Sequence, residues 1–218
     1  MSDMRRRAKA SPEPDGGSPW AARRRRPRDH EVKREAVIRA AARAFNEHGY
    51  HHTSLDDIAA DLGVTKPTVY YYVANKEQLL FECFLAGLKP IRAALREADR
   101  LEGTGRNRLD AVIRGYATAI ASEYGWCMVR AHDQDLGVDM RRQINALKSE
   151  IDQGIRRLLR AGMDDGSIAP CDPKITAFAL AGALNWIAHW YRADQMLSAT
   201  EIADAFVGFF ERGLQPRP

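Results

Sequence analysis

The chain has 218 residues, of which 45% are hydrophobic and 28% are charged, a composition typical of a folded globular protein. No uninterrupted apolar run reaches the ~18 residues of a membrane span, and the N-terminus lacks the apolar stretch of a secretion signal. We therefore expect a cytoplasmic protein with no membrane partner. The cysteines (Cys83, Cys127 and Cys171) form no CxxC pair, and their odd number argues against a disulfide framework.

The formal charge of +4 is unevenly distributed along the chain. Residues 1–30 hold nine Arg or Lys against four Asp or Glu, so they carry +5 and the remainder sums to −1. Residues 1–29 are rich in Pro, Gly, Ser and Arg, which predicts a disordered arm. Its run Arg23–Arg26 suits contact with phosphates or a narrow minor groove; the alternative is a solvated charge run with no specific role.

Helical periodicity begins near Glu31 and ends at Gly49, as expected of a glycine at a helix C-terminus. A second, short helix follows, and Thr53 or Ser54 can cap it. A tight turn at residues 63–64 ends this helix.

A third short helix is predicted from Thr65, which can cap it, to about Tyr72. Pro67 fits its first turn, because a proline lacks the N–H that would be unpaired there. Val69 is expected to face inward. One of the three consecutive tyrosines that follow must also face inward, and we expect this to be Tyr71.

The rest of the chain also shows helical patterns. Pro90 is expected to bend the fourth helix. Asp172 and Ser198 are predicted N-caps, the latter in a capping box with Glu201. Residues 125–139 read as irregular, with a short helix as an alternative. The predicted helices lie at about residues 75–101, 109–124, 140–163, 173–191 and 199 onward. With no alternating strand pattern, the fold class is all-α: an N-terminal three-helix helix-turn-helix plus a C-terminal helical domain.

The third helix has the properties of a DNA-reading helix. It must enter a groove about 12 Å wide, so its leading end must be slim and must carry hydrogen-bonding groups. The run Thr65–Tyr72 supplies small hydroxyls, a cation and aromatic rings with polar tips. Lys76 adds a second cation at the start of the next helix.

The motifs at 53–59, 62–64, 67–73 and 75–80 resemble the DNA-binding domain of the TetR (tetracycline-repressor) family, in register over residues 32–82. This chain has Pro67 and Val73 where many members have Gly and Phe. The resemblance implies that Thr53, Tyr70 and Lys76 bind phosphates and that other residues of the helix lie nearest the bases. The predicted DNA-binding residues are Thr53, Ser54, Thr65, Lys66, Pro67, Thr68, Tyr70, Tyr72 and Lys76.

The C-terminal part resembles the family through shorter motifs at 165–168, 181–186, 190–191 and 202–206. They are similar to a subgroup with members that respond to acyl-coenzyme A thioesters or related lipid-like metabolites. The resemblance thus implies a small-molecule effector, such as an acyl-CoA thioester or a hydrophobic metabolite. The predicted organisation is an arm at 1–29, a helix-turn-helix at 30–76 and a ligand-binding and dimerisation domain at 77–218.

Small and aromatic residues near the C-terminus predict two sites. Small side chains let helices approach closely, which suits a homodimer of two helices from each subunit, although an ordinary intrachain core is the alternative. The candidate dimer residues are Ala177, Ala181, Ala188, Phe206 and Phe209. The candidate pocket residues, which alternatively are simple core, are Tyr116, Ile120, Trp126, Met128, Trp186, His189 and Trp190. Arg130 or His132 could meet an anionic ligand.

We find no residue constellation that indicates an enzyme. No nucleophile elbow, glycine-rich phosphate loop or HExxH motif is present. His48, His51 and His52 lack an evident fourth metal ligand, and His132, Asp133 and Asp135 form only a weak metal pattern. We expect no cofactor and no metal. The predicted function is a ligand-responsive repressor that binds an inverted-repeat operator as a homodimer. The alternative is an architectural DNA-binding protein without a ligand, for which the 136 residues of 83–218 are more than dimerisation needs.

Overall fold

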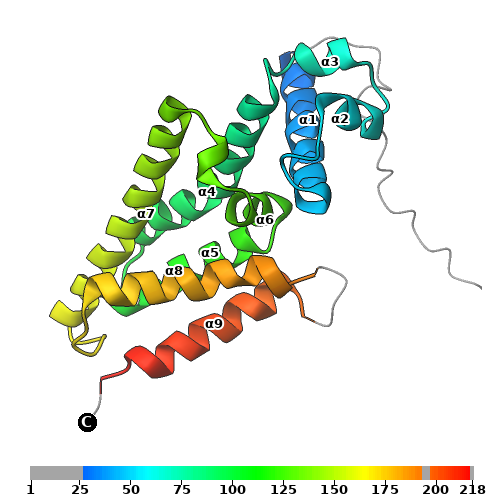
Figure 1. Cartoon of the computed structure of the whole chain (residues 1–218). Coiled ribbons are helices and arrows are strands. Elements are labelled where there is room, and N and C mark those ends of the chain that lie inside the picture. The colour runs from blue at the N-terminus through cyan, green and yellow to red at the C-terminus, as the bar shows by residue number, and fades with distance from the viewer. Residues whose placement is uncertain (1–26, 193–196, 217–218) are drawn as a thin grey trace, which may run out of the picture.

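The computed structural model describes residues 27–192 and 197–216, and this part of the chain is helical throughout, without strands (Figure 1). The N-terminal helices are α1 (Pro27–His48), α2 (Leu55–Asp61) and α3 (Lys66–Tyr70). They gather at one end of the molecule in the arrangement of a helix-turn-helix. The predicted arm lies almost entirely outside the described residues.

The remaining helices form a second layer built around α5 (Gly105–Ile120). This helix packs against its neighbours in the chain and also against the helices that follow. Figure 1 shows α8 and α9 on the side of the molecule away from α1–α3. The other elements are α4 (Lys76–Arg100), α6 (Glu123–Arg130), the 3-10 helix η1 (Asp133–Asp135), α7 (Val138–Asp164), α8 (Pro173–Trp190) and α9 (Ala199–Leu214). Within the described ranges, none of these helices is both long and apolar enough to cross a bilayer.

The predicted helix caps are confirmed. The Asp172 carboxylate accepts hydrogen bonds from the backbone N–H groups of Lys174 and Ile175. Ser198 and Glu201 form a reciprocal capping box at the start of α9. These caps depend only on residues two or three positions apart, which is why the sequence shows them.

Some helix boundaries differ from the prediction. The helix α3 ends at Tyr70 rather than near Tyr72, and α1 begins at Pro27. The helix α5 begins at Gly105, inside the predicted loop, because Thr104 and Asn107 form a capping box there. The helix α5 ends at Ile120 rather than near Tyr124, and the short helix given as the alternative for residues 125–139 is present as α6 (Glu123–Arg130).

Candidate nucleic-acid interface and internal cavity

The helix-turn-helix is held together by a small apolar core. Val69 on α3 is fully buried, as predicted, together with Leu55 and Ile58 of α2. Gly63 adopts φ +64° in the turn between the two helices, a conformation that favours glycine. The inward face of α3 is thereby fixed, and its opposite face is left for solvent.

The leading end of α3 is exposed and hydrogen-bonded. The hydroxyls of Thr65 and Thr68 lie 2.9 Å apart. The Lys66 ammonium donates to the Asp56 carboxylate at 2.7 Å, and this bond raises the pKa of Lys66. Pro67 occupies the first turn of the helix, as predicted. These four residues present hydroxyls and a cation at one end of the molecule, where a DNA groove can approach.

The prediction that Tyr71 is the inward-facing tyrosine is wrong. Tyr71 is 68% exposed and Tyr70 is 47% exposed, whereas Tyr72 is half-buried. The reason is that α3 ends at Tyr70, so the following turn places the next two rings differently from a continuous helix. His30 at the start of α1 packs 5.5 Å from the Tyr71 ring and 5.0 Å from the Tyr72 ring, a contact that the sequence patterns do not reveal.

Two predicted DNA-binding residues, Thr53 and Ser54, already have partners inside the protein. Thr53 is only 2% exposed, and its hydroxyl lies 2.9 Å from the Gly49 carbonyl and 3.2 Å from the Ala44 carbonyl. The structure therefore corrects the role of its side chain, which ties the turn after α1 to that helix. Ser54 caps α2 in a capping box with Asp57, and the hydrogen bonds from Ser54 lower the pKa of Asp57.

Lys76 also differs from a free phosphate ligand. Its ammonium donates to the backbone carbonyls of Tyr50 and Thr53, both at 3.0 Å, and lies 4.4 Å from the centre of the Tyr50 ring. An ammonium has three donors. Lys76 thus joins the start of α4 to the turn before α2, and one donor is left for a phosphate.

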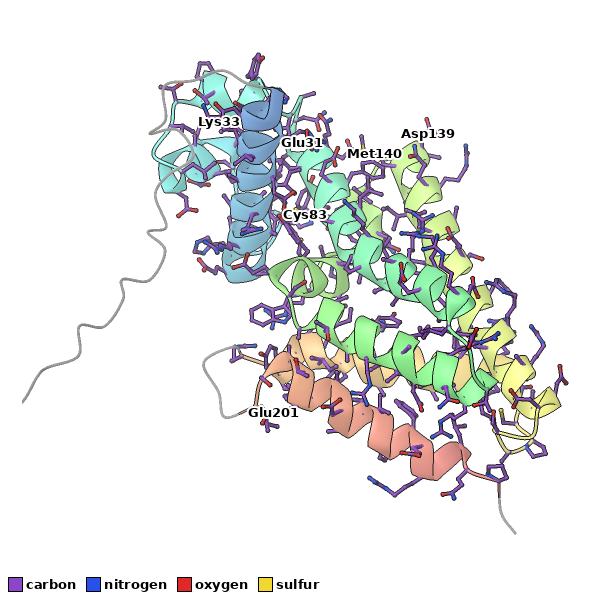
Figure 2. All side chains as sticks on the ribbon, turned by 180° about the vertical axis from the view of Figure 1, so that it is seen from behind. Glu31, Lys33, Cys83, Asp139, Met140 and Glu201 are labelled. Carbon is purple, nitrogen blue, oxygen red and sulfur yellow. The ribbon has the colours of Figure 1, made fainter. Side chains whose placement is uncertain are left out.

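Several polar contacts connect the helix-turn-helix to the rest of the molecule. Arg43 on α1 forms an ion pair with Glu123 on α6 at 2.6 Å, and the Asn46 amide donates to the Glu123 carbonyl at 2.9 Å. The Tyr124 hydroxyl donates to Glu35 at 2.5 Å. Cys83 lies on α4 beside α1 (Figure 2), and its thiol contacts the backbone of α1. The orientation of α1 therefore depends on α4 and α6.

A cavity of about 530 Å³ lies in the second layer, bounded by residues of α4–α8 and η1. Of the predicted pocket residues, Tyr116 and Met128 line it. The Tyr116 hydroxyl donates to the Asn185 side chain at 3.1 Å, and burial raises the pKa of Tyr116 to about 12. The lining residues are Leu88, Tyr116, Met128, Val129, Ala131, His132, Asp133, Gln134, Lys148, Ile151, Asp152, Ile155, Ala177, Phe178, Ala181 and Asn185.

The other predicted pocket residues lie elsewhere. Ile120 is fully buried in the core. The guanidinium groups of Arg130 and Arg192 lie 5.5 and 5.7 Å from the centre of the Trp126 ring. Arg130 does not line this cavity but donates to the Ala188 carbonyl at 2.6 Å, whereas His132 does line it. The outward-facing members of the predicted pocket are Trp186, His189 and Trp190. These side chains of α8 are exposed and do not line the cavity.

Only some of the candidate dimer residues lie on an exposed surface. Ala177 and Ala181 line the cavity and Ala188 is buried, so these three do not form an exposed seam. Phe209 is 63% exposed, and it forms with Phe206 one side of an apolar groove between α8 and α9. The residues of this groove are Gly182, Ala183, Trp186, Ala205, Phe206 and Phe209. An exposed apolar surface of this kind marks a contact site.

In the described part of the chain, no group of three or more His, Cys, Asp or Glu side chains is arranged to hold a metal. Nε2 of His51 lies 3.0 Å from Oδ1 of Asp135 in η1.

A helix-turn-helix with an exposed third helix, joined to a helical domain around a cavity, defines a class of DNA-binding regulator. Residues 37–83 match the family described as "Bacterial regulatory proteins, tetR family", and residues 102–214 match "Tetracyclin repressor-like, C-terminal domain". The chain belongs to the TetR family of transcriptional regulators, which are DNA-binding proteins and not enzymes.

Named relatives agree with this assignment. The transcriptional activator FasR of Mycolicibacterium smegmatis is 24% identical over 221 residues, covering 100% of this chain and 98% of FasR. The TetR-family regulator PfmR from Thermus thermophilus is 28% identical, with a TM-score of 0.75 over 83% of this chain and 99% of PfmR. AibR, solved in complex with isovaleryl coenzyme A and operator DNA, is 28% identical, with a TM-score of 0.70 over 81% of this chain and 97% of AibR.

Proposed function

We propose that the protein is a cytoplasmic, ligand-responsive repressor that binds an inverted-repeat operator as a homodimer and is released by a small-molecule effector. The observation that carries this proposal is the cavity of about 530 Å³. Its size is in the range of small-molecule sites, and its wall includes α6 and η1, which also contact the helix-turn-helix. An architectural DNA-binding protein needs no such cavity.

On the DNA side, the predicted residues of α3 support base reading. Thr65, Lys66, Pro67 and Thr68 stand at the exposed leading end of the helix, and Tyr70 is half-exposed beside them. We propose that Thr68 and Lys66 contact base edges and that Tyr70 contacts the backbone. The partly buried Tyr72 would contact the DNA with the part of its side chain that is exposed.

The exposed groove between α8 and α9 supports a homodimer. A twofold axis through this groove would cover Trp186 and Phe209 in both subunits and would present two α3 helices to the DNA. An operator read in this way is an inverted repeat, with half-sites about one helical turn apart or somewhat more.

The effector class is proposed from AibR, whose structure holds isovaleryl coenzyme A. We propose an acyl-CoA thioester or a related hydrophobic metabolite. Apolar lining residues such as Leu88, Ile151 and Ile155 suit an acyl chain.

The test begins with selection of binding sites from a random DNA pool with the full chain. The selected duplex is labelled, and its release is followed by fluorescence anisotropy during titration with isovaleryl-CoA, decanoyl-CoA and free CoA. We expect enrichment of an inverted repeat and its release by a thioester but not by free CoA. A pool without sequence enrichment would contradict the proposal, as would a selected operator that no thioester or hydrophobic metabolite in a broader panel releases. A chromosomal promoter fusion then distinguishes repression from activation.

A further inference from the structure

One short segment separates the cavity from the helix-turn-helix. Residues 131–137 contain η1 and connect α6 to α7. Ala131 and His132 line the large cavity, and both also line a second cavity of about 280 Å³ beside the turn between α1 and α2. If a ligand displaced this segment, the surroundings of the turn between α1 and α2 in the helix-turn-helix would therefore change.

Two contacts attach the segment to the DNA-binding end. Asp135 Oδ1 lies 3.0 Å from Nε2 of His51, which is in the turn between α1 and α2. The backbone N–H of Gly137 donates to the Glu77 carboxylate, in the first turn of α4, at 2.7 Å. The segment thus contacts both the start of α4 and the turn that precedes α2.

An ion pair attaches the same segment to the cavity wall. Nζ of Lys148, on α7, lies 2.7 Å from both carboxylate oxygens of Asp133. Lys148 is the one permanent cation among the described residues that line the cavity, and the second acid there, Asp152, is bound by Arg156 at 2.7 Å. Lys148 also lies 5.3 Å from the centre of the buried Phe84 ring, which helps to fix its position.

We propose that Lys148 binds the anionic group of the effector and that Asp133 occupies this position when no ligand is bound. A carboxylate or phosphate of the ligand replaces Asp133, segment 131–137 moves, and its contacts with His51 and Glu77 are lost. The inference rests on the proposed function and adds to it the chemical class of the effector, an anionic amphiphile, and the residue that selects it.

The physical reason is the cost of leaving a charge unpaired where it is partly removed from water, since the Lys148 and Asp133 side chains are 39% and 29% exposed. Exchange of one anion for another leaves Lys148 paired, so the electrostatic cost of binding is small. A neutral ligand of the same shape cannot displace Asp133 without leaving Lys148 unpaired. The cavity should therefore discriminate decanoate from decan-1-ol, although both fill its apolar part equally.

Two variants move ligand affinity in opposite directions under this proposal. Asp133→Asn removes the competing carboxylate, so decanoate should bind roughly 5-fold more tightly or better, at the lower end of typical coupling between sites. Lys148→Met keeps the apolar stem but removes the cation, so decanoate should bind at least roughly 5-fold more weakly while decan-1-ol is unaffected. Both variants should weaken operator binding without ligand, because both release the segment. A merely structural role of the pair would instead change ligand affinity in the same direction in both.

The matched control is Asp139→Asn. Asp139 also pairs with a cation on α7, Arg142 at 3.3 Å, but this pair is highly exposed and lies outside the cavity. Figure 2 shows Asp139 at the free end of α7. This variant should bind ligand and operator as the unmodified chain does.

The experiment measures decanoate, decanoyl-CoA and decan-1-ol binding by calorimetry and operator binding by anisotropy, for the unmodified chain and the three variants. Decanoate identifies a free carboxylate as the bound group, and binding of decanoyl-CoA alone identifies the phosphates. Weaker anion binding by Asp133→Asn, equal binding of decan-1-ol and the anions to the unmodified chain, or no anion binding by Asp133→Asn would each overturn the inference. Failure of the proposed function looks different: the unmodified chain would then select no operator at all.

Discussion

Replacement of Lys76 by Met tests whether this lysine stabilises the helix-turn-helix through its contacts within the protein. Its ammonium donates to two backbone carbonyls, Tyr50 and Thr53, at 3.0 Å and lies 4.4 Å from the Tyr50 ring. A hydrogen bond to a charged group contributes about 1.5–3 kcal/mol, and a cation–π contact at an exposed site about 0.5–1 kcal/mol. Because Lys76 is only half-buried, we halve the sum of the two hydrogen bonds and the cation–π contact and expect a loss of about 2–3.5 kcal/mol in the free energy of unfolding.

In a chain of this length such a loss corresponds to a fall in melting temperature of about 4–14 °C. The assay is thermal denaturation followed by circular dichroism, without DNA. Lys89→Met is the matched control, because Lys89 is an exposed residue of the same helix and should leave the melting temperature unchanged. If Lys76→Met melts with the unmodified chain but loses operator affinity, Lys76 is a phosphate ligand only and the reasoning is refuted.

Three further predictions concern the core, the groove and the cavity. Val69→Ala should lower the free energy of unfolding by about 2 kcal/mol, since Val69 is fully buried. Tyr71→Ala should leave the melting temperature unchanged, and an equal loss of stability in both variants would show that Tyr71 belongs to the core. Gly182→Glu should yield monomers in light scattering. Its circular dichroism spectrum should stay normal, because a side chain at Gly182 meets nothing within the subunit. Gln153→Glu on α7 is the control, and a Gly182→Glu dimer would exclude the groove as the interface. Burial raises the pKa of Tyr116 to about 12. The neutral hydroxyl therefore stabilises the fold fully below pH ~10, and this contribution is lost as the pH rises toward about 12. In urea titrations across that pH interval, Tyr116→Phe should lose less free energy of unfolding than the unmodified chain.

The parts of the structure that the sequence predicts are those with local causes. The cap at Asp172 and the capping box of Ser198 and Glu201 involve neighbours in the chain, and the motifs from 53 to 80 specify the helix-turn-helix. The start of α5 was missed because its capping box uses Asn107 in place of Glu or Gln, and because Gly105 reads as a loop residue. The reason for a glycine there is tertiary: a side chain at Gly105 would collide with the backbone of α7 at Gly162.

The candidate sites could be predicted only in part, because they depend on contacts between residues that are not neighbours in the sequence. The small residues Ala177 and Ala181 indicate that α8 has a narrow face, but they do not say whether a helix or a cavity lies beside it. The inward position of Tyr72 depends on where α3 ends and on His30, which is distant in sequence. The Lys148–Asp133 pair is separated by 15 residues across a 3-10 turn, so no helical spacing reveals it.

The central claim is that the exposed leading end of α3 reads DNA sequence. The most direct test is a titration of Thr68→Ala on the selected operator and on a scrambled duplex of the same composition, with the unmodified chain in parallel. Because the Thr68 hydroxyl stands at that end of the helix, we expect a loss of about 1–3 kcal/mol on the operator and a much smaller loss on the scrambled duplex. Equal losses on the two duplexes would contradict the assignment of α3 as the reading helix.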